Sequence, residues 1–172
     1  MRLLALLLLL LPLTVSAQWS STNDEPCVGW IAAYESEATV DLNATTYALY
    51  TGWDANLGYS KGGSYITTGS NAITIGTLCA GQYKVGGSMA FQGTVGEYHC
   101  DVFIGDEELH GAGFRRTIGN TNQFGVSAWG PSAVMLPAAS VVTLKCKAEA
   151  NETLQADTAS LYVERVGPYV AP

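Results

Sequence analysis

The sequence predicts an all-β fold, and three observations lead to that prediction. Short runs of alternating apolar and polar residues recur along the chain, separated by clusters of Gly, Asn, Asp and Ser. After residue 17, no stretch keeps the 3.6-residue periodicity of an amphipathic helix. Charged residues make up only 13% of the chain, against roughly 25% in an average soluble domain, which excludes a coiled coil, a charge-rich helical bundle and a disordered chain. Many short strands at regular spacing fit a sandwich or a barrel.

Several segments have the length and pattern of strands. They are residues 28–34, 38–42, 46–50, 72–75, 82–92, 97–105, 141–148 and 159–166. In the clearest segment, Tyr83, Val85 and Phe91 share one parity, so a period of two places them on the core face. Between the strands, residues 51–70 are expected to be the largest irregular stretch, and residues 150–157 a polar turn.

The first 17 of the 172 residues are expected to form a cleavable signal peptide. A short basic start, Met1-Arg2, precedes a mostly apolar run over residues 3–15, and Val15-Ser16-Ala17 has the small-residue pattern of a signal-peptidase site. That run is shorter than the roughly 20 apolar residues that span a bilayer. We therefore expect a secreted protein, extracellular or, in a bacterium, periplasmic, with no membrane insertion after the leader is removed.

The remainder is expected to be one domain. Residues 18–26 form a polar N-terminal arm, residues 27–167 the folded domain and residues 168–172 a short C-terminal tail. Loss of Arg2 with the leader leaves seven basic against 15 acidic residues, a net charge of −8. A chain this acidic, with no cluster of Lys and Arg, is unsuited to binding nucleic acid or anionic lipid.

The chain has four cysteines, Cys27, Cys79, Cys100 and Cys146. An even number behind an export signal predicts two disulfides, because the exported compartment is oxidising. A four-cysteine zinc site is the alternative, but zinc ligands come in pairs two to four residues apart, and these gaps are 52, 21 and 46 residues. On this reasoning all three possible pairings stay open.

Three runs, taken in order, carry a resemblance. The first is Ala80-Gly81-Gln82-Tyr83-Lys84-Val85, continuing to Ser88-Met89-Ala90-Phe91; the second is Ala133-Val134-Met135-Leu136 with Val141-Val142-Thr143-Leu144; the third is Ala159-Ser160-Leu161-Tyr162-Val163. They resemble the start of an inner strand, the penultimate strand pair and the last strand of the tumour necrosis factor and complement-globular-head jelly-roll superfamily. The resemblance covers roughly residues 28–167. It fails at the turn over residues 137–140, where Pro-Ala-Ala-Ser replaces the frequent Gly-Asp.

The resemblance implies a two-sheet antiparallel jelly-roll sandwich that forms a homotrimer and binds proteins or glycans. It places Trp129 and Tyr162 at the aromatic positions around the trimer axis, where each would bury area against its symmetry mates. The alternative is that both are ordinary core or surface aromatic residues.

The resemblance also implies a pairing of the cysteines. The strands of Cys100 and Cys146 become neighbours in one sheet, where two core-facing cysteines can meet disulfide geometry. Cys27 and Cys79 then pair at one end of the other sheet.

Neither enzymatic activity nor a cofactor is expected. His99 adjoins Cys100 on a strand, so their side chains point to opposite faces and cannot act as base and nucleophile. Residues 125–129 depart from the nucleophile-elbow pattern, and residues 111–116 from the dinucleotide-binding pattern. The run Asp106-Glu107-Glu108 could contribute to a calcium site, but a solvated turn is the stronger interpretation, because calcium takes six or more oxygen ligands. A carboxylate pair of the kind that hydrolyses sugars stays open.

Two further features bear on binding. Trp53, Tyr59 and Tyr65, in the glycine-rich residues 51–70, could stack on sugar rings; the alternative is that they pin this segment to the core. Asn43-Ala44-Thr45 and Asn151-Glu152-Thr153 are sequons near predicted turns, where N-glycosylation could be accommodated.

The leading hypothesis is therefore a secreted, non-enzymatic interaction module, a homotrimeric jelly roll that binds a protein or a cell surface through its loops. A carbohydrate-binding domain is the alternative from a different class. A structural or decoration component of a virus particle is the third hypothesis. The export signal argues against the third, because particles assembled in the cytoplasm do not use one.

Overall fold

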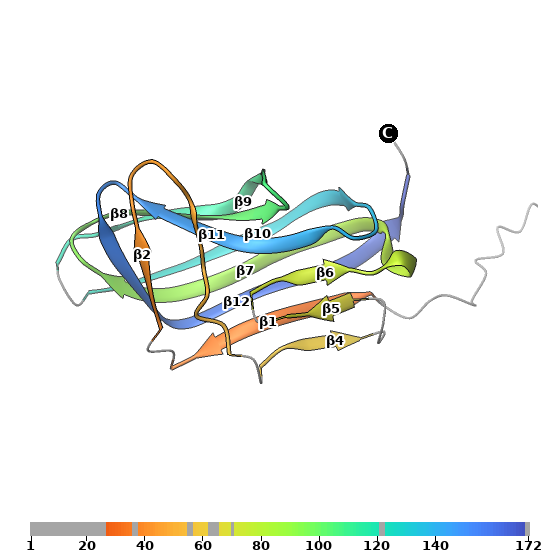
Figure 1. Cartoon of the computed structure of the whole chain (residues 1–172), viewed down its shortest axis with the longest axis horizontal. Coiled ribbons are helices and arrows are strands. Elements are labelled where there is room, and N and C mark those ends of the chain that lie inside the picture. Colours follow the sequence, from red (N-terminus) through yellow and green to blue (C-terminus); the bar gives the residue numbers. More distant parts are fainter. Residues whose placement is uncertain are drawn as a thin grey trace, which may run out of the picture.

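The computed structural model describes residues 27–35, 38–54, 57–61, 66–69, 71–120 and 123–170. Within them the chain forms a sandwich of two antiparallel six-stranded sheets, which confirms the all-β prediction (Figure 1). The only helical element in these ranges is the short 3₁₀ helix Thr77–Cys79. The described part of the chain offers no helix with the length and hydropathy of a membrane span. The expected signal peptide over residues 1–17 and the arm over residues 18–26 lie outside the described residues.

The first sheet, which we call sheet A, has the strand order β10-β7-β12-β1-β4. Its strands are β10 (Phe124–Leu136), β7 (Gly81–Gly93), β12 (Glu152–Pro168), β1 (Val28–Tyr34) and β4 (Tyr59–Lys61), with β2 (Thr39–Leu42) beside β12. The long strands β7 and β12 lie side by side along the molecule (Figure 1). β12 has two partners on its other edge, because residues 152–155 pair with β2 and residues 158–164 with β1.

The second sheet, sheet B, has the order β5-β6-β11-β8-β9. Its strands are β5 (Ile66–Thr68), β6 (Ile73–Ile75), β11 (Val141–Ala148), β8 (Gly96–Ile104) and β9 (Glu107–Ile118), with β3 (Ala48–Leu49) beside β11. The inner faces of the two sheets enclose the core, as the alternation predicts. Tyr83, Val85 and Phe91 are fully buried, whereas Gln82 and Lys84 are exposed. Each large apolar side chain buried in this way stabilises the fold by roughly 1.5–3 kcal/mol.

One end of the core is a continuous row of aromatic rings that joins four strands. Phe91 of β7 meets Tyr98 of β8 with ring centroids 5.3 Å apart. Phe91 also contacts Phe114 of β9, and Phe114 stacks on Trp129 of β10, each at 5.6 Å. Because these rings come from both sheets, they tie the two layers together.

Both disulfides form with the pairing that the resemblance implies. Cys100 and Cys146 lie directly opposite each other on β8 and β11, with Cα atoms 4.1 Å apart. Cys27 precedes β1 and Cys79 ends the 3₁₀ helix before β7, with Cα atoms 5.8 Å apart. β1 and β7 both run antiparallel to β12, so their first residues lie at the same end of sheet A.

The predicted polar turn over residues 150–157 is wrong in extent, because β12 already begins at Glu152. Leu154 and Ala156 are buried, so this polar stretch alternates like any other strand. The outward Thr153 donates a 3.2 Å hydrogen bond to Asp41 of β2, which satisfies a polar side chain on the outer face.

Two other parts of the chain also differ from the prediction. The segment over residues 51–70 is not irregular throughout, because the short strands β4 and β5 form within it. The sequence pattern does not predict β9, in which Ala112, Phe114 and Ile118 face the core. A bulge opposite β8, between Asp101 and Phe103, interrupts the alternation that would have marked this strand.

Candidate functional site

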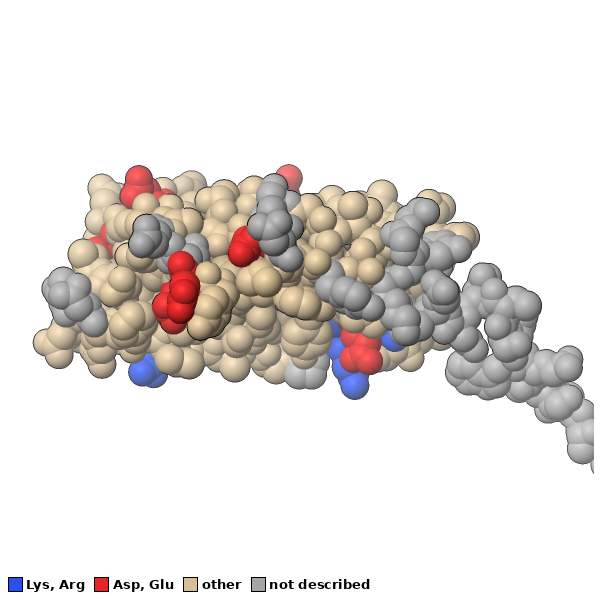
Figure 2. All heavy atoms as spheres, turned by 90° about the horizontal axis from the view of Figure 1, so that it is seen from below, with Lys and Arg blue, Asp and Glu red and all other residues tan. Residues whose placement is uncertain are grey.

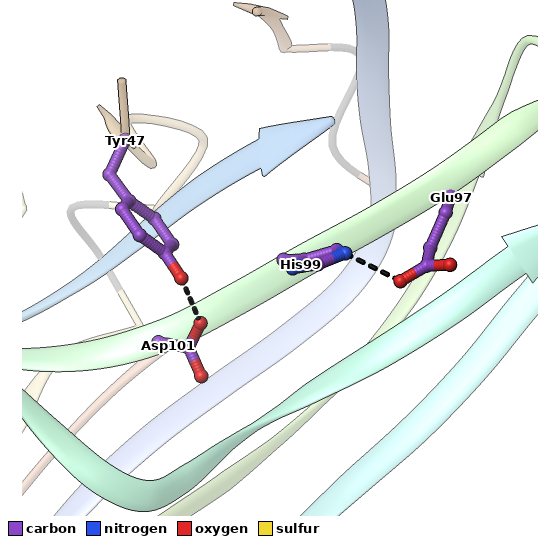
Figure 3. A network of polar contacts seen from close by, with 4 residues as sticks. All are labelled: Tyr47, Glu97, His99 and Asp101. Carbon is purple, nitrogen blue, oxygen red and sulfur yellow. Dashed lines mark hydrogen bonds and ion pairs between the residues drawn. The ribbon is translucent and has the colours of Figure 1, made fainter. Parts of the chain in front are cut away.

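The outer face of sheet B carries a network of polar side chains (Figure 3). Glu97, His99 and Asp101 alternate along β8 and therefore share this face. His99 Nε2 lies 2.6 Å from a carboxylate oxygen of Glu97, and the Tyr47 hydroxyl donates a 2.5 Å hydrogen bond to Asp101. Burial, and then this hydrogen bond, raises the pKa of Tyr47 well above its usual range, so the hydroxyl stays a donor at neutral pH.

Two lysines complete the polar surface of sheet B. Lys147 Nζ lies 4.4 Å from the centroid of the Tyr47 ring, and Lys145 Nζ lies 4.5 Å from that of Phe103. Lys145 also lies 3.4 Å from the carboxylate of Asp106. Contacts of a cation with an aromatic ring contribute about 0.5–1 kcal/mol at exposed sites. These charged groups have partners within their own chain, as suits a face turned to solvent.

The outer face of sheet A is different, because three successive rows across its strands contain only uncharged residues. From β1 through β12 and β7 to β10, the rows are Trp30, Tyr162 and Gly86; Ala32, Ser160, Ser88 and Ala128; and Tyr34, Thr158, Ala90 and Val126. We call these rows the uncharged face. In the next row, Lys84 and Glu164 lie opposite each other on β7 and β12. Figure 2 is a view from below Figure 1, toward the edge at which β1 and β4 lie; uncharged residues cover most of the described surface there, with a few acidic and basic side chains among them.

Large apolar side chains lie on both margins of the uncharged face. Tyr34 of β1 is 64% exposed and Val126 of β10 is 67% exposed. In the row between them, Thr158 and Ala90 have small, uncharged side chains. In the neighbouring row, the hydroxyls of Ser88 and Ser160 share a 3.0 Å hydrogen bond. Contiguous apolar patches of more than a few hundred Å² are rare on monomeric proteins, and aromatic side chains with few charges are typical of surfaces at which proteins associate.

Tyr162 lies over Gly86, in the row of the uncharged face that adjoins Lys84 and Glu164. A Cβ built on Gly86 would come 2.7 Å from the Tyr162 hydroxyl oxygen, so the phenol ring uses space that only glycine leaves open. The side chain is half-buried, and its place in the register puts it on the outer face. Its proposed place at a trimer axis remains a prediction.

Trp129 has the opposite orientation, and the prediction that it lies at a trimer axis is wrong. The side chain is 5% exposed and stacks on Phe114 of sheet B. In the register of sheet A it shares a row with Gly87 and the buried Leu161, so its parity directs the indole inward. Trp129 is a core aromatic residue, the alternative that the sequence left open.

The aromatic residues predicted for a ligand-binding loop are dispersed. Trp53 is buried, meets Tyr50 edge to face with centroids 4.9 Å apart, and lines a pocket of about 280 Å³. Tyr59 begins β4, where it pairs with Trp30, and Tyr65 lies outside the described residues. Tyr34, Glu35, Thr51 and Asp54 also line the pocket.

The two sequon asparagines lie together at one end of the sandwich. Asn43 follows β2 and Asn151 precedes β12, and both line a pocket of about 380 Å³. Asn43 Oδ1 accepts hydrogen bonds from the backbone N–H groups of Thr45 and Thr46, at 2.9 and 2.8 Å. Both asparagines therefore occupy turns, as predicted, and their glycosylation remains a prediction.

The residues considered for catalysis or calcium do not converge. His99 lies on the outer face of β8, whereas Cys100 faces the core in a disulfide. Asp106 lies in the turn before β9 and contacts Lys145, while Glu107 and Glu108 belong to the strand. Among the described residues, no three His, Cys, Asp or Glu side chains gather where they could hold a metal ion.

Sequence reasoning missed the outward side chains of Trp30, Tyr34 and Val126. A signal for the first two was present, because the core-facing parity of Ile31 and Ala33 in residues 28–34 leaves Trp30 and Tyr34 on the other face. Val126 had no such signal, since the pattern does not reveal the first half of β10.

Comparison with known proteins gives a result for structure but not for sequence. No protein-family model and no curated protein matches the chain. Its structure is similar to Eiger TNF from S. frugiperda, with a TM-score of 0.59 and 11% identity over 86% of this chain and 97% of that one. For the globular domain of zebrafish complement 1qA protein the TM-score is 0.53 and the identity 10%, over 84% and 99%. For the vertex protein P5 of PRD1 the values are 0.52 and 11%, over 83% and 99%.

At these identities the likeness concerns the fold. It extends over nearly the whole described chain and includes both a tumour necrosis factor and a complement head. The two antiparallel sheets and the last strand, β12, agree with the fold that the resemblance read from the sequence implies. The chain therefore has a jelly-roll fold similar to that of these proteins.

Proposed function

We propose that this chain is a secreted, non-enzymatic interaction module that assembles as a homotrimer and binds a protein or a cell surface through its loops. The observation that carries the proposal is the uncharged face of sheet A. Its rows contain no charge, whereas the outer face of sheet B holds a network of charged groups with partners in their own chain. Contact between copies of the chain therefore costs less desolvation of charge at the uncharged face of sheet A than at the outer face of sheet B.

The usual symmetry of homo-oligomers and the resemblance read from the sequence both support a closed trimer. Soluble homo-oligomers are mostly closed by rotational symmetry, and the superfamily resemblance implies three copies. Tyr162 lies on the uncharged face, on strand β12 inside sheet A, where contact with symmetry mates would bury an aromatic side chain at a small entropy cost.

Measurement of the mass in solution tests the assembly. The wild-type protein is expected to have the mass of a trimer by light scattering at micromolar concentration, and a monomer would refute the assembly. Val126→Asp places a charge on the uncharged face and is expected to give monomers. Val141→Asp is the matched control, because Val141 lies on the outer face of sheet B. Equal masses for the two variants would contradict the proposed interface.

Secretion is supported by the leader over residues 1–17 and by the two disulfides, which persist in an oxidising compartment. The fold fits a secreted module and a structural component of a virus particle equally well, because the TM-scores for the vertex protein P5 of PRD1 and for the complement globular domain are 0.52 and 0.53. The leader and the disulfides favour the secreted module. Recovery of the protein from the culture medium, with its N-terminus at Gln18, is the expected result.

A further inference from the structure

The register of sheet A brings the two sequons together. In the β2–β12 pair, Leu42 lies opposite Glu152, and this is the last pair at that end of the ladder. Asn43 and Asn151 are the next residues beyond it, and both line the same pocket of about 380 Å³, so open space adjoins both side chains. Two sequons that are far apart in the sequence therefore lie side by side in the fold.

The turn that follows Asn43 orients its amide group. Oδ1 of Asn43 accepts hydrogen bonds from the backbone N–H groups and the hydroxyls of Thr45 and Thr46, at distances between 2.8 and 3.0 Å. A backbone N–H can donate only to the oxygen of an amide side chain, so these bonds fix which end of the amide faces the turn. Nδ2 therefore points away from the turn. N-glycosylation replaces one hydrogen of Nδ2 and leaves Oδ1 free to keep all four hydrogen bonds.

Asn151 is exposed in the turn between β11 and β12, and the order of the strands keeps both sequons open during synthesis. β12 is the last strand of the chain and pairs with β2, β1 and β7. These pairings of sheet A form only after residue 152 has been made, and therefore after both sequons have been made. Each asparagine can thus meet a glycosyl transferase before sheet A is complete.

We propose that Asn43 and Asn151 both carry N-linked oligosaccharides, which together cover this end of the sandwich. In each transfer a bond forms between Nδ2 and C1 of the first N-acetylglucosamine, while the bond from C1 to the oxygen of a lipid diphosphate donor breaks. The leaving diphosphate takes the amide proton. The proposal rests on the secretion proposed above, because the donor and its transferase lie in the secretory compartment. The opposite end of β12, where Cys27 pairs with Cys79, stays uncovered.

The glycans are compatible with the proposed assembly. On β12 the uncharged face includes Thr158, Ser160 and Tyr162, whereas Asn151 precedes the first residue of the strand, Glu152. At the usual rise of a strand, roughly 20 Å separates Asn151 from Thr158. Both sequons therefore lie beyond the end of the uncharged face.

The test is to express the full chain, with its own leader, in a eukaryotic cell line and to map the glycans of the product. Peptide N-glycosidase in H₂¹⁸O converts each modified asparagine into an ¹⁸O-labelled aspartate, which peptide mass spectrometry locates. The label is expected at positions 43 and 151. Secreted protein that lacks the label at either position would overturn the proposal and leave secretion in place. Protein that stays in the cell with an uncleaved leader and no glycan would overturn both.

Two neighbouring threonines supply a matched pair of variants for the first sequon. Thr45 and Thr46 each donate a 3.0 Å hydrogen bond from the hydroxyl to Asn43 Oδ1, but only Thr45 belongs to the sequon. Thr45→Ala is expected to lose the mass of one whole glycan, whereas Thr46→Ala loses an equivalent hydrogen bond and is expected to keep the glycan. Retention of the label at position 43 in Thr45→Ala would overturn the assignment of this site.

The second sequon has its own pair of variants. Thr153→Ser keeps a hydroxyl, both for the sequon and for the 3.2 Å hydrogen bond to Asp41, and is expected to keep the glycan on Asn151. Thr153→Val is expected to lose it. Trimming of the folded wild type with an endoglycosidase is expected to leave the number of chains per particle unchanged. Dissociation on trimming would contradict the placement of the glycans beyond the uncharged face.

Discussion

The indole of Trp129 lies over Gly87, across the β10–β7 pair, in space that any larger residue at position 87 would need. A Cβ built on Gly87 would come 2.5 Å from Trp129 Cζ2 and 2.1 Å from the backbone oxygen of Ser160. Real Cβ atoms essentially never approach other atoms to less than 3.0 Å, and a backbone oxygen inside a sheet cannot move aside cheaply. Gly87 is therefore required for the packing of the aromatic row between the sheets.

Gly87→Ala is expected to lower the free energy of unfolding by about 1–3 kcal/mol, the usual cost of overpacking a core. Gly130→Ala, in the same strand pair, is the matched control, because nothing lies within 4 Å of a Cβ built there. The control is expected to stay within about 0.5 kcal/mol of the wild type. Urea unfolding followed by tryptophan fluorescence measures both, and equal midpoints for the two variants would contradict the packing argument.

Removal of either disulfide is expected to destabilise the fold to a similar extent. The sequence separations of the two pairs, 52 and 46 residues, are close, so each restricts the unfolded chain by a comparable amount. Replacing Cys100 and Cys146 together by Ala, or Cys27 and Cys79 together, is expected to cost about 2–5 kcal/mol in urea unfolding. Non-reducing peptide mapping of the wild type provides the control. A peptide that joins Cys79 to Cys100 would refute both pairings.

Tyr162→Asp is expected to convert the proposed trimer into monomers, because three carboxylates would be brought together at a buried axis. Light scattering measures the mass, and the thermal transition shows whether the variant is folded. Tyr162→Phe keeps the ring over Gly86 and is expected to keep the assembly. An unchanged trimer mass for a folded Tyr162→Asp protein would remove Tyr162 from the interface.

The stability of the protein is expected to fall at alkaline pH, in part through Tyr83. Burial raises the pKa of Tyr83 from its usual 10.0 to about 12, while its hydroxyl donates a 2.6 Å hydrogen bond to the Cys79 carbonyl. A raised pKa means that the unfolded chain releases this proton first. The contribution of Tyr83 is therefore fully present below pH 10 and is lost as the pH rises toward 12.

Urea midpoints measured between pH 8 and pH 12 check this expectation. Tyr83→Phe is expected to be less stable at pH 8 by about 1 kcal/mol, because it loses the hydrogen bond, and to lose less stability as the pH rises. A decline in stability with the same slope in both proteins would show that Tyr83 does not contribute to it.

Much of the fold could be predicted because burial follows a local pattern. The core-facing residues of β7 alternate without interruption from Tyr83 to Phe91, and β1 begins and ends at the predicted residues. The even number of cysteines and the export signal indicated two disulfides. The resemblance then implied the pairing that the structure shows, Cys27 with Cys79 and Cys100 with Cys146.

The candidate site was less accessible from the sequence, because it depends on contacts between distant segments. Tyr34 and Glu35 meet Trp53 and Asp54 at one pocket only because the segment after β3 bonds back to β1. The neutrality of the outer face of sheet A could be recognised only once the order of its strands was known, since each of its rows draws residues from at least three strands.

The amino-acid order alone determined that this chain builds a β-sandwich, which residues of its regular strands lie inside, and that its cysteines join in pairs. These properties depend on composition and on alternation within one strand. The tertiary structure decided that Trp129 points into the core, that β12 starts at Glu152 and that the outer face of sheet A carries no charge in its three rows. The physical reason is register: a bulge such as that between Trp129 and Ser132, or a slip of one residue, exchanges the two faces of a strand, and only pairing with neighbouring strands sets it.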